Sequence, residues 1–61
     1  MFNREELEIL EELLNEEILN CLRSGHSLKN EYVINCRNIL KKLNLREIYD
    51  YDKKFKNTEE N

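Results

Sequence analysis

The chain has 61 residues, of which 38% are charged, and it contains one Gly, no Pro and no Trp. This length allows one domain at most, and a chain this short buries only about 60% of its unfolded surface. The absence of Pro and the single Gly argue against a β protein. The net charge of −3 argues against a nucleic-acid partner. No segment has the apolar length of a membrane span or a secretory signal, so we expect a cytoplasmic protein without membrane association.

Charge is divided along the chain. Residues 1–22 carry a net charge of −6, residues 23–46 a net charge of +5, and residues 47–61 a net charge of −2. An acidic helix followed by a basic one, joined by a short turn that contains Gly25, predicts an antiparallel hairpin. Exposed ion pairs contribute only about 0–1 kcal/mol each. The charges therefore favour the antiparallel orientation of the two helices more than they stabilise the fold.

The start of the first helix is marked by Asn3, with Glu6 three residues later, which is the capping-box pattern. Gly25 is expected just beyond the C-terminus of this helix, where a left-handed conformation is common. Between these limits, apolar residues recur at helical spacing. They are Leu7, Leu10, Leu14, Ile18, Cys21 and Leu22.

The apolar arc of this first helix is wider than a hairpin requires. With Ile9 and Leu13 at its edge it covers about 220°, whereas a surface helix needs roughly 100°. We therefore expect a third helix or a second copy of the chain to pack against it. Glu17 projects inside the arc, where a carboxylate needs a cation or a hydrogen-bond donor. It is either an interface contact or a side chain that reaches the solvated rim.

The second helix is predicted to begin after Ser27, a favourable N-cap residue. Its apolar side consists of Leu28, Tyr32, Cys36, Ile39, Leu40 and Leu43, while Ile34 falls on the opposite side. Asn44 allows three continuations. It ends the helix in a left-handed conformation, it caps a short third helix within residues 45–56, or the second helix runs through it.

These patterns predict an all-α fold: an antiparallel helical hairpin, with or without a short third C-terminal helix, packed as an oligomeric bundle. We expect one helical domain over residues 1–56 and a frayed tail over residues 57–61. The residues predicted to form the core or the interface between copies are Leu7, Leu10, Leu14, Glu17, Ile18, Cys21, Tyr32, Cys36, Ile39 and Leu43.

Few residues suggest chemistry. Cys21 and Cys36 are expected at different heights of the hairpin, too far apart for a disulfide, and to act as small buried apolar residues. One His and two distant Cys do not make a tetrahedral metal site. The chain has no Gly-rich phosphate loop and no nucleophile motif. The sequence therefore predicts a protein that is not an enzyme and uses no cofactor or metal.

The order of features from Phe2 to Leu43 resembles the short helical-hairpin proteins of phages and mobile elements of low-GC Gram-positive bacteria. The shared features are a capped helix rich in Glu and Leu, a short Ser/Gly turn and a second helix that closes with the residues from Ile39 to Leu43. This resemblance implies a regulator or inhibitor of host machinery. It also admits an oligomer that sequesters a nucleotide signal.

The stretch from Ser27 to Asn44 is also similar in length to the sporulation-regulatory aspartyl-phosphate phosphatase family, another short hairpin. That family carries a Ser-Gln-Glu-Leu-Asp signature on its second helix. Of the matching residues 37–41, only Leu40 agrees, and the acidic position is Lys41. The resemblance implies a hairpin that docks on a helical partner, without phosphatase activity.

Two functions follow from these observations. The first is a non-enzymatic regulatory or inhibitory protein that associates with itself and binds a host protein. The alternative is an oligomer that binds a small anionic ligand, such as a nucleotide signal, between subunits. The candidate contacts to a ligand or partner are Arg23, Lys29 and Arg37.

Overall fold

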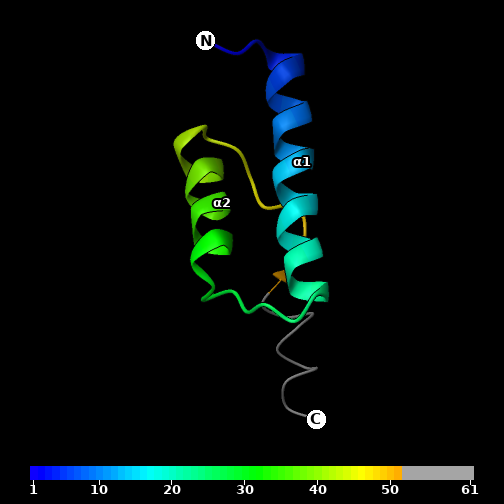
Figure 1. Ribbon diagram of the computed structural model, residues 1–61. Coiled ribbons are helices and arrows are strands. Elements are labelled where there is room, and N and C mark those ends of the chain that lie inside the picture. The colour runs from blue at the N-terminus through cyan, green and yellow to red at the C-terminus, as the bar shows by residue number, and fades with distance from the viewer. Residues whose placement is uncertain (52–61) are drawn as a thin grey trace.

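The computed structural model describes residues 1–51, which form two helices packed side by side in opposite directions (Figure 1). Helix α1 spans Arg4–Arg23 and α2 spans Glu31–Lys42. The predicted all-α hairpin is therefore confirmed, and no strand occurs within residues 1–51. In this part of the chain no helix has the length and apolar character needed to cross a membrane.

Helix α1 begins with the predicted capping box. The Glu6 backbone N–H donates to the Asn3 side-chain oxygen at 2.8 Å, and the Asn3 backbone N–H donates to the Glu6 carboxylate at 2.9 Å. Two backbone donors that the helix itself cannot satisfy therefore have partners. Glu5 and Glu6 also place negative charge at the positive end of the helix dipole.

Both helices end in the same backbone motif. After α1, the N–H groups of Gly25 and His26 donate to the carbonyls of Leu22 and Cys21, at 3.1 and 3.0 Å. After α2, Asn44 donates to the carbonyl of Lys41 and the next residue donates to that of Leu40, at 3.1 and 2.8 Å. These are Schellman motifs, which require a left-handed residue just beyond the helix. Gly25 has φ 97° and Asn44 has φ 58°.

The second helix begins three residues later than predicted. Its N-cap is Asn30, whose side-chain oxygen accepts from the N–H groups of Tyr32 and Val33 at 2.9 and 3.4 Å. Ser27 instead closes a separate turn, in which its own carbonyl accepts from the Asn30 N–H at 3.0 Å. Serine and asparagine are about equally good caps. The turn also brings Leu28 against the core, which favours the later start.

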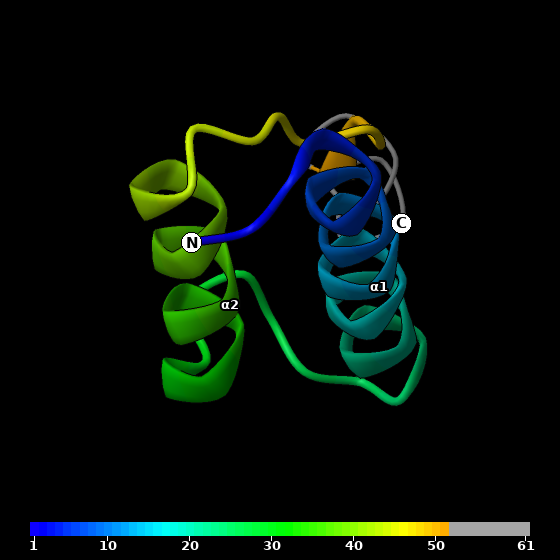
Figure 2. The same ribbon diagram turned by 90° about the horizontal axis from the view of Figure 1, so that it is seen from above.

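The chain leaves α2 at Asn44 and crosses back to α1. Residues 45–51, here called the strap, run from the end of α2 along one side of the hairpin (Figure 2). The continuation of α2 through Asn44 is therefore wrong, because Asn44 is the left-handed residue that ends it. Residues 45–50 are not helical. Tyr51 is helical, whereas residues 52–56 of the predicted third helix and the tail over residues 57–61 lie outside the described residues.

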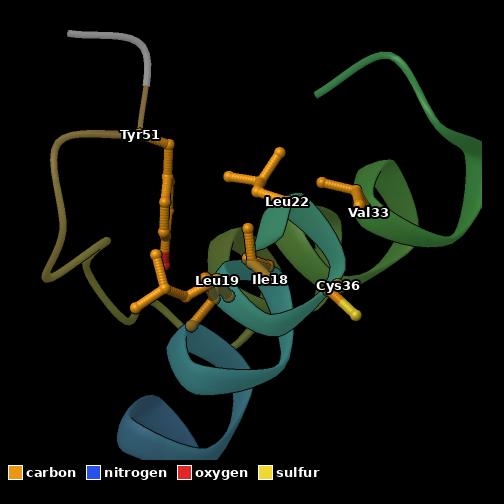
Figure 3. Close-up of a cluster of buried hydrophobic side chains, with 7 residues drawn as sticks. Ile18, Leu19, Leu22, Val33, Cys36 and Tyr51 are labelled. Carbon is orange, nitrogen blue, oxygen red and sulfur yellow. The ribbon is translucent and has the colours of Figure 1, made fainter. Parts of the chain in front are cut away.

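The core lies where α1, α2 and the strap meet (Figure 3). Its buried apolar residues are Ile18, Leu19, Leu22, Val33, Cys36, Leu40 and Tyr51. Leu14, Cys21, Leu28, Leu45 and Tyr49 are partly buried around them. The Tyr51 ring reaches α1 beside Leu19 (Figure 3). Burial of a large apolar side chain contributes roughly 1.5–3 kcal/mol before the loss of conformational entropy, so Tyr51 gives the strap a substantial anchor.

A buried asparagine joins the strap to α1. Asn15 is 0% exposed, and its amide donates to the carbonyls of Glu11 and Arg46 at 2.7 and 3.1 Å. Its side-chain oxygen accepts from the Ile48 N–H at 2.8 Å and from the Tyr51 hydroxyl. Both amide hydrogens and the oxygen of Asn15 are thus used, which is what a buried amide requires.

Charged residues of the strap connect it to both helices. Arg46 lies 3.8 Å from the Glu11 carboxylate of α1, and the adjacent Glu47 lies 2.5 Å from the Arg37 guanidinium of α2. Tyr49 adds a hydrogen bond from its hydroxyl to Glu16, also at 2.5 Å. The attraction between acidic and basic segments that the sequence predicts is therefore made in part through the strap.

The left-handed conformation of Asn44 gives a first prediction. In this conformation Ala pays roughly 1–2 kcal/mol, whereas Asn tolerates it better than other residues with a Cβ, so Asn44→Ala should lower the free energy of unfolding by about 1 kcal/mol. Asn44→Gly should leave it within about 0.5 kcal/mol of the original, since Gly adopts positive φ readily. Urea denaturation followed by circular dichroism measures both. Equal stability of the two variants would contradict this account of the helix end.

The hydrogen bonds of Asn15 give a second prediction. Asn15→Leu leaves the Arg46 carbonyl, the Ile48 N–H and the Tyr51 hydroxyl without this partner, so we expect a loss of about 2–4 kcal/mol. Tyr51→Phe removes one hydroxyl and should cost about 1 kcal/mol. Asn20→Leu, at an exposed position of α1, is the matched control and should change stability little. A similar loss for Asn15→Leu and Asn20→Leu would show that the amide does not hold the strap.

Candidate functional site: the open face of the hairpin

The hairpin has two long sides, and the strap covers only one. Successive helical residues point about 100° apart, so each side chain can be assigned to a side from its position in the sequence. On α1, Asn15 and Leu19 point towards the strap, and on α2 the guanidinium of Arg37 does so. The residues that point the other way form a continuous surface across both helices, here called the open face.

The open face consists of Leu10, Leu13, Glu17 and Cys21 of α1, Tyr32 and Ile39 of α2, and Leu43, the C-cap of α2. Four of these positions are more than a third exposed, although three of them are large apolar or aromatic side chains. Leu13 is 60% exposed, Tyr32 is 53% and Ile39 is 43%. Single exposed apolar residues are common, but a contiguous group spanning two helices is typical of an interaction surface.

The predicted core and interface residues divide between the inside of the hairpin and this face. Ile18 and Cys36 are buried in the core, and Leu7 and Leu14 are half-buried. Leu10, Cys21 and Leu43 are half-buried at the base of the open face. Tyr32, Ile39 and Glu17 are exposed, so a single hairpin does not bury them. The arc of α1 is thus wider than one partner helix covers, as its sequence predicts.

Glu17 lies in the middle of the open face and faces α2. Its negative charge is the main reason that the pKa of the Tyr32 hydroxyl is raised above its ordinary value. Burial raises the pKa of the Cys36 thiol, and Cys21 and Glu17 raise it further. These electrostatic effects arise because Glu17, Cys21, Tyr32 and Cys36 lie at one level of the hairpin. Glu17 itself is exposed.

Both cysteines are free thiols. Cys36 is buried in the core and Cys21 is half-buried beside it. The raised pKa of the Cys36 thiol favours the protonated form, which is a poor nucleophile and a poor metal ligand. Within residues 1–51, no group of three His, Cys, Asp or Glu side chains is arranged to hold a metal ion.

The three candidate cations lie on different elements. Arg23 is at the C-terminal end of α1, Lys29 is in the connection between the helices, and Arg37 is in α2. The guanidinium of Arg37 is engaged by Glu47 of the strap, through Nε at 2.5 Å and a second nitrogen at 3.4 Å. Arg37 therefore holds the strap. The three cations come from three different segments of the chain.

The list of predicted core and interface residues lacks Asn15, Leu19 and Tyr51, although all three are buried. A signal for Asn15 was present, because its angular position lies between Leu22 and Leu19 on a helical wheel. A polar amide in that place needs partners, and the strap supplies them. In the described part of the chain, every buried side-chain nitrogen or oxygen has a hydrogen-bond partner. The Asn15 network is therefore structural.

No protein-family model matches the chain, and no characterised protein or solved structure shows significant similarity to it. The two resemblances drawn from the sequence stay predictions.

The electrostatic link between Glu17 and Tyr32 gives a third prediction. Because the Glu17 charge opposes formation of the tyrosinate, Glu17→Gln should lower the pKa of Tyr32 towards its ordinary value. Ultraviolet absorbance of the tyrosinate during an alkaline titration measures this shift, and Tyr32→Phe identifies the contribution of Tyr32. Glu5→Gln, in the first turn of α1, is the matched control and should leave the curve unchanged. An unchanged curve for Glu17→Gln would mean that the two residues do not face each other.

Proposed function

We propose that this chain is a small non-enzymatic interaction protein that acts through its open face. Its activity is association: the exposed apolar residues of α1 and α2 pack against an apolar helical surface of a protein partner. The observation that carries this proposal is the exposure of Leu13, Tyr32 and Ile39 on one side of the hairpin, while the other side is covered by the chain's own strap.

Energetic considerations support this role. Association gains roughly 25 cal/mol for each Å² of apolar surface that the open face removes from water. A domain this small buries little apolar surface within one copy, so burial of the open face adds stability that the hairpin alone does not have. Small helical proteins commonly obtain additional stability by oligomerisation or binding. The compositional resemblance to phage and mobile-element hairpins suggests that such association serves a regulatory or inhibitory role towards a host protein.

The alternative, binding of a small anionic ligand between subunits, has weaker support. It relies on Arg23, Lys29 and Arg37 as free cations, and the Arg37 guanidinium is already engaged by Glu47. Binding an anion with Arg37 would have to compete with this carboxylate. Protein association needs no such rearrangement, and we therefore favour it.

Site-specific photocrosslinking in the cells that produce the chain tests the role of the open face. A photoreactive amino acid in place of Leu13 should give discrete covalent adducts, because this side chain lies within the proposed contact surface. The same amino acid in place of Ile48, which is 46% exposed on the strap, is the matched control and should give few adducts.

The masses of the adducts separate the outcomes. A discrete adduct from position 13 supports association through the open face, whether it contains a second copy or a different protein. Equal adduct formation from positions 13 and 48 would contradict the proposal, as would the absence of adducts from position 13.

A further inference from the structure

We propose that the occupant of the open face is a second copy of the chain, and that two hairpins form an antiparallel four-helix bundle. In this bundle each α1 lies between two α2 helices, its own and the partner's. The inference rests on the proposed function, because it assumes that the open face is the association surface. It adds the identity of the partner and the arrangement of the two copies.

The composition of the open face fits another hairpin of the same kind. Both helices contribute to it, with Leu10 and Leu13 from α1 and Ile39 and the C-cap residue Leu43 from α2. Two such faces placed together make the core of a four-helix bundle, in which each helix has apolar residues towards both neighbours. A face that complements itself in this way closes with two-fold symmetry, and the open face of each copy covers that of the other.

Charge selects one of the two ways to bring these faces together. Helix α1 contains seven Glu, one of which, Glu17, lies on the open face, whereas α2 contains one Glu and three basic residues. Of these three, Arg37 points towards the strap, and Lys41 and Lys42 lie in the last turn of the helix. A two-fold axis parallel to the helices places each acidic α1 over the basic α2 of the partner. A two-fold axis perpendicular to the helices instead places α1 over α1, which brings the two acidic helices together. Like charges across an interface are costly, so the first arrangement is favoured.

The favoured arrangement also provides for Glu17. This carboxylate lies in the middle of the open face, where association removes it from water and a hydrogen-bond donor is needed. In the alternating bundle it faces the α2 of the partner, and Tyr32 carries a hydroxyl donor on that helix. In the arrangement with α1 over α1, this carboxylate would face another acidic helix.

A pair of isoleucines on α2 tests the interface. Ile39 is 43% exposed on the open face, and Ile34 is 41% exposed on another side of the same helix. Sedimentation should show a dimer for the unmodified chain and for Ile34→Glu at about 100 μM. Ile39→Glu should weaken dimerisation by more than about 100-fold, because two carboxylates would enter the apolar interface. Circular dichroism checks that both variants keep their helices.

Energy transfer between two N-termini tests the arrangement. In the alternating bundle both copies run in the same direction, so the N-termini of the two α1 helices lie at the same end, roughly 14 Å apart across a bundle with 8–10 Å between neighbouring helices. With α1 over α1 they lie at opposite ends, about 30 Å apart for a 20-residue helix. Donor and acceptor dyes on the terminal amines leave the cysteines unchanged, and a pair whose Förster radius lies between these two separations distinguishes the arrangements. We expect efficient transfer in mixed dimers.

Several results would overturn the inference. A monomer at about 100 μM, an assembly larger than a dimer, or equal dissociation by Ile34→Glu and Ile39→Glu would exclude the open face as a two-fold interface. Inefficient transfer within a dimer would exclude the alternating arrangement. The results that contradict the proposed function differ from those that contradict the second copy as partner. A monomer in solution that still forms a discrete adduct with another protein from position 13 keeps the function and loses only the second copy.

Discussion

The buried amide of Asn15 is the interaction on which the shape of this protein depends. It donates to the Arg46 carbonyl and accepts from the Ile48 N–H, so one side chain satisfies two backbone groups of the strap. Together with the buried ring of Tyr51, this fixes the strap to one side of α1. Because the strap covers only that side, the apolar residues on the other side of the hairpin stay exposed. The open face is therefore a consequence of where the strap binds.

The sequence predicts the helices better than their surroundings. The start of α1 at Asn3 and its end at Gly25 depend on residues within one or two turns, and such local signals identify both ends correctly. The start of α2 was harder, since Ser27 and Asn30 are both good caps and the choice depends on how the connection packs Leu28 against the core. Asn44 ends α2 because its left-handed conformation lets its own N–H and that of Leu45 donate to two carbonyls of the last turn. The residues after Asn44 are equally compatible with the start of a third helix capped by Asn44.

The candidate site was predicted only in part, for a physical reason. The excess width of the apolar arc of α1 is visible from helical periodicity, which placed Leu13 at the edge of the arc and Glu17 inside it. Periodicity does not say which edge of the arc the chain covers itself. That depends on contacts between residues more than 30 positions apart, such as Asn15 with Arg46 and Tyr51. Leu19 is buried for the same reason, although it lies outside the predicted stripe.

The strap also has a consequence for the order of folding. Contacts within the hairpin join residues that are close in sequence, whereas the contacts from Asn15 to the strap close loops of 31 to 36 residues. Loop closure costs entropy before the distant contacts form, so local helices and the hairpin are expected to form first and the strap last. Until it arrives, Leu19 and the amide of Asn15 remain in water. A newly made chain then exposes apolar residues on both sides, and during this interval it is most prone to aggregate.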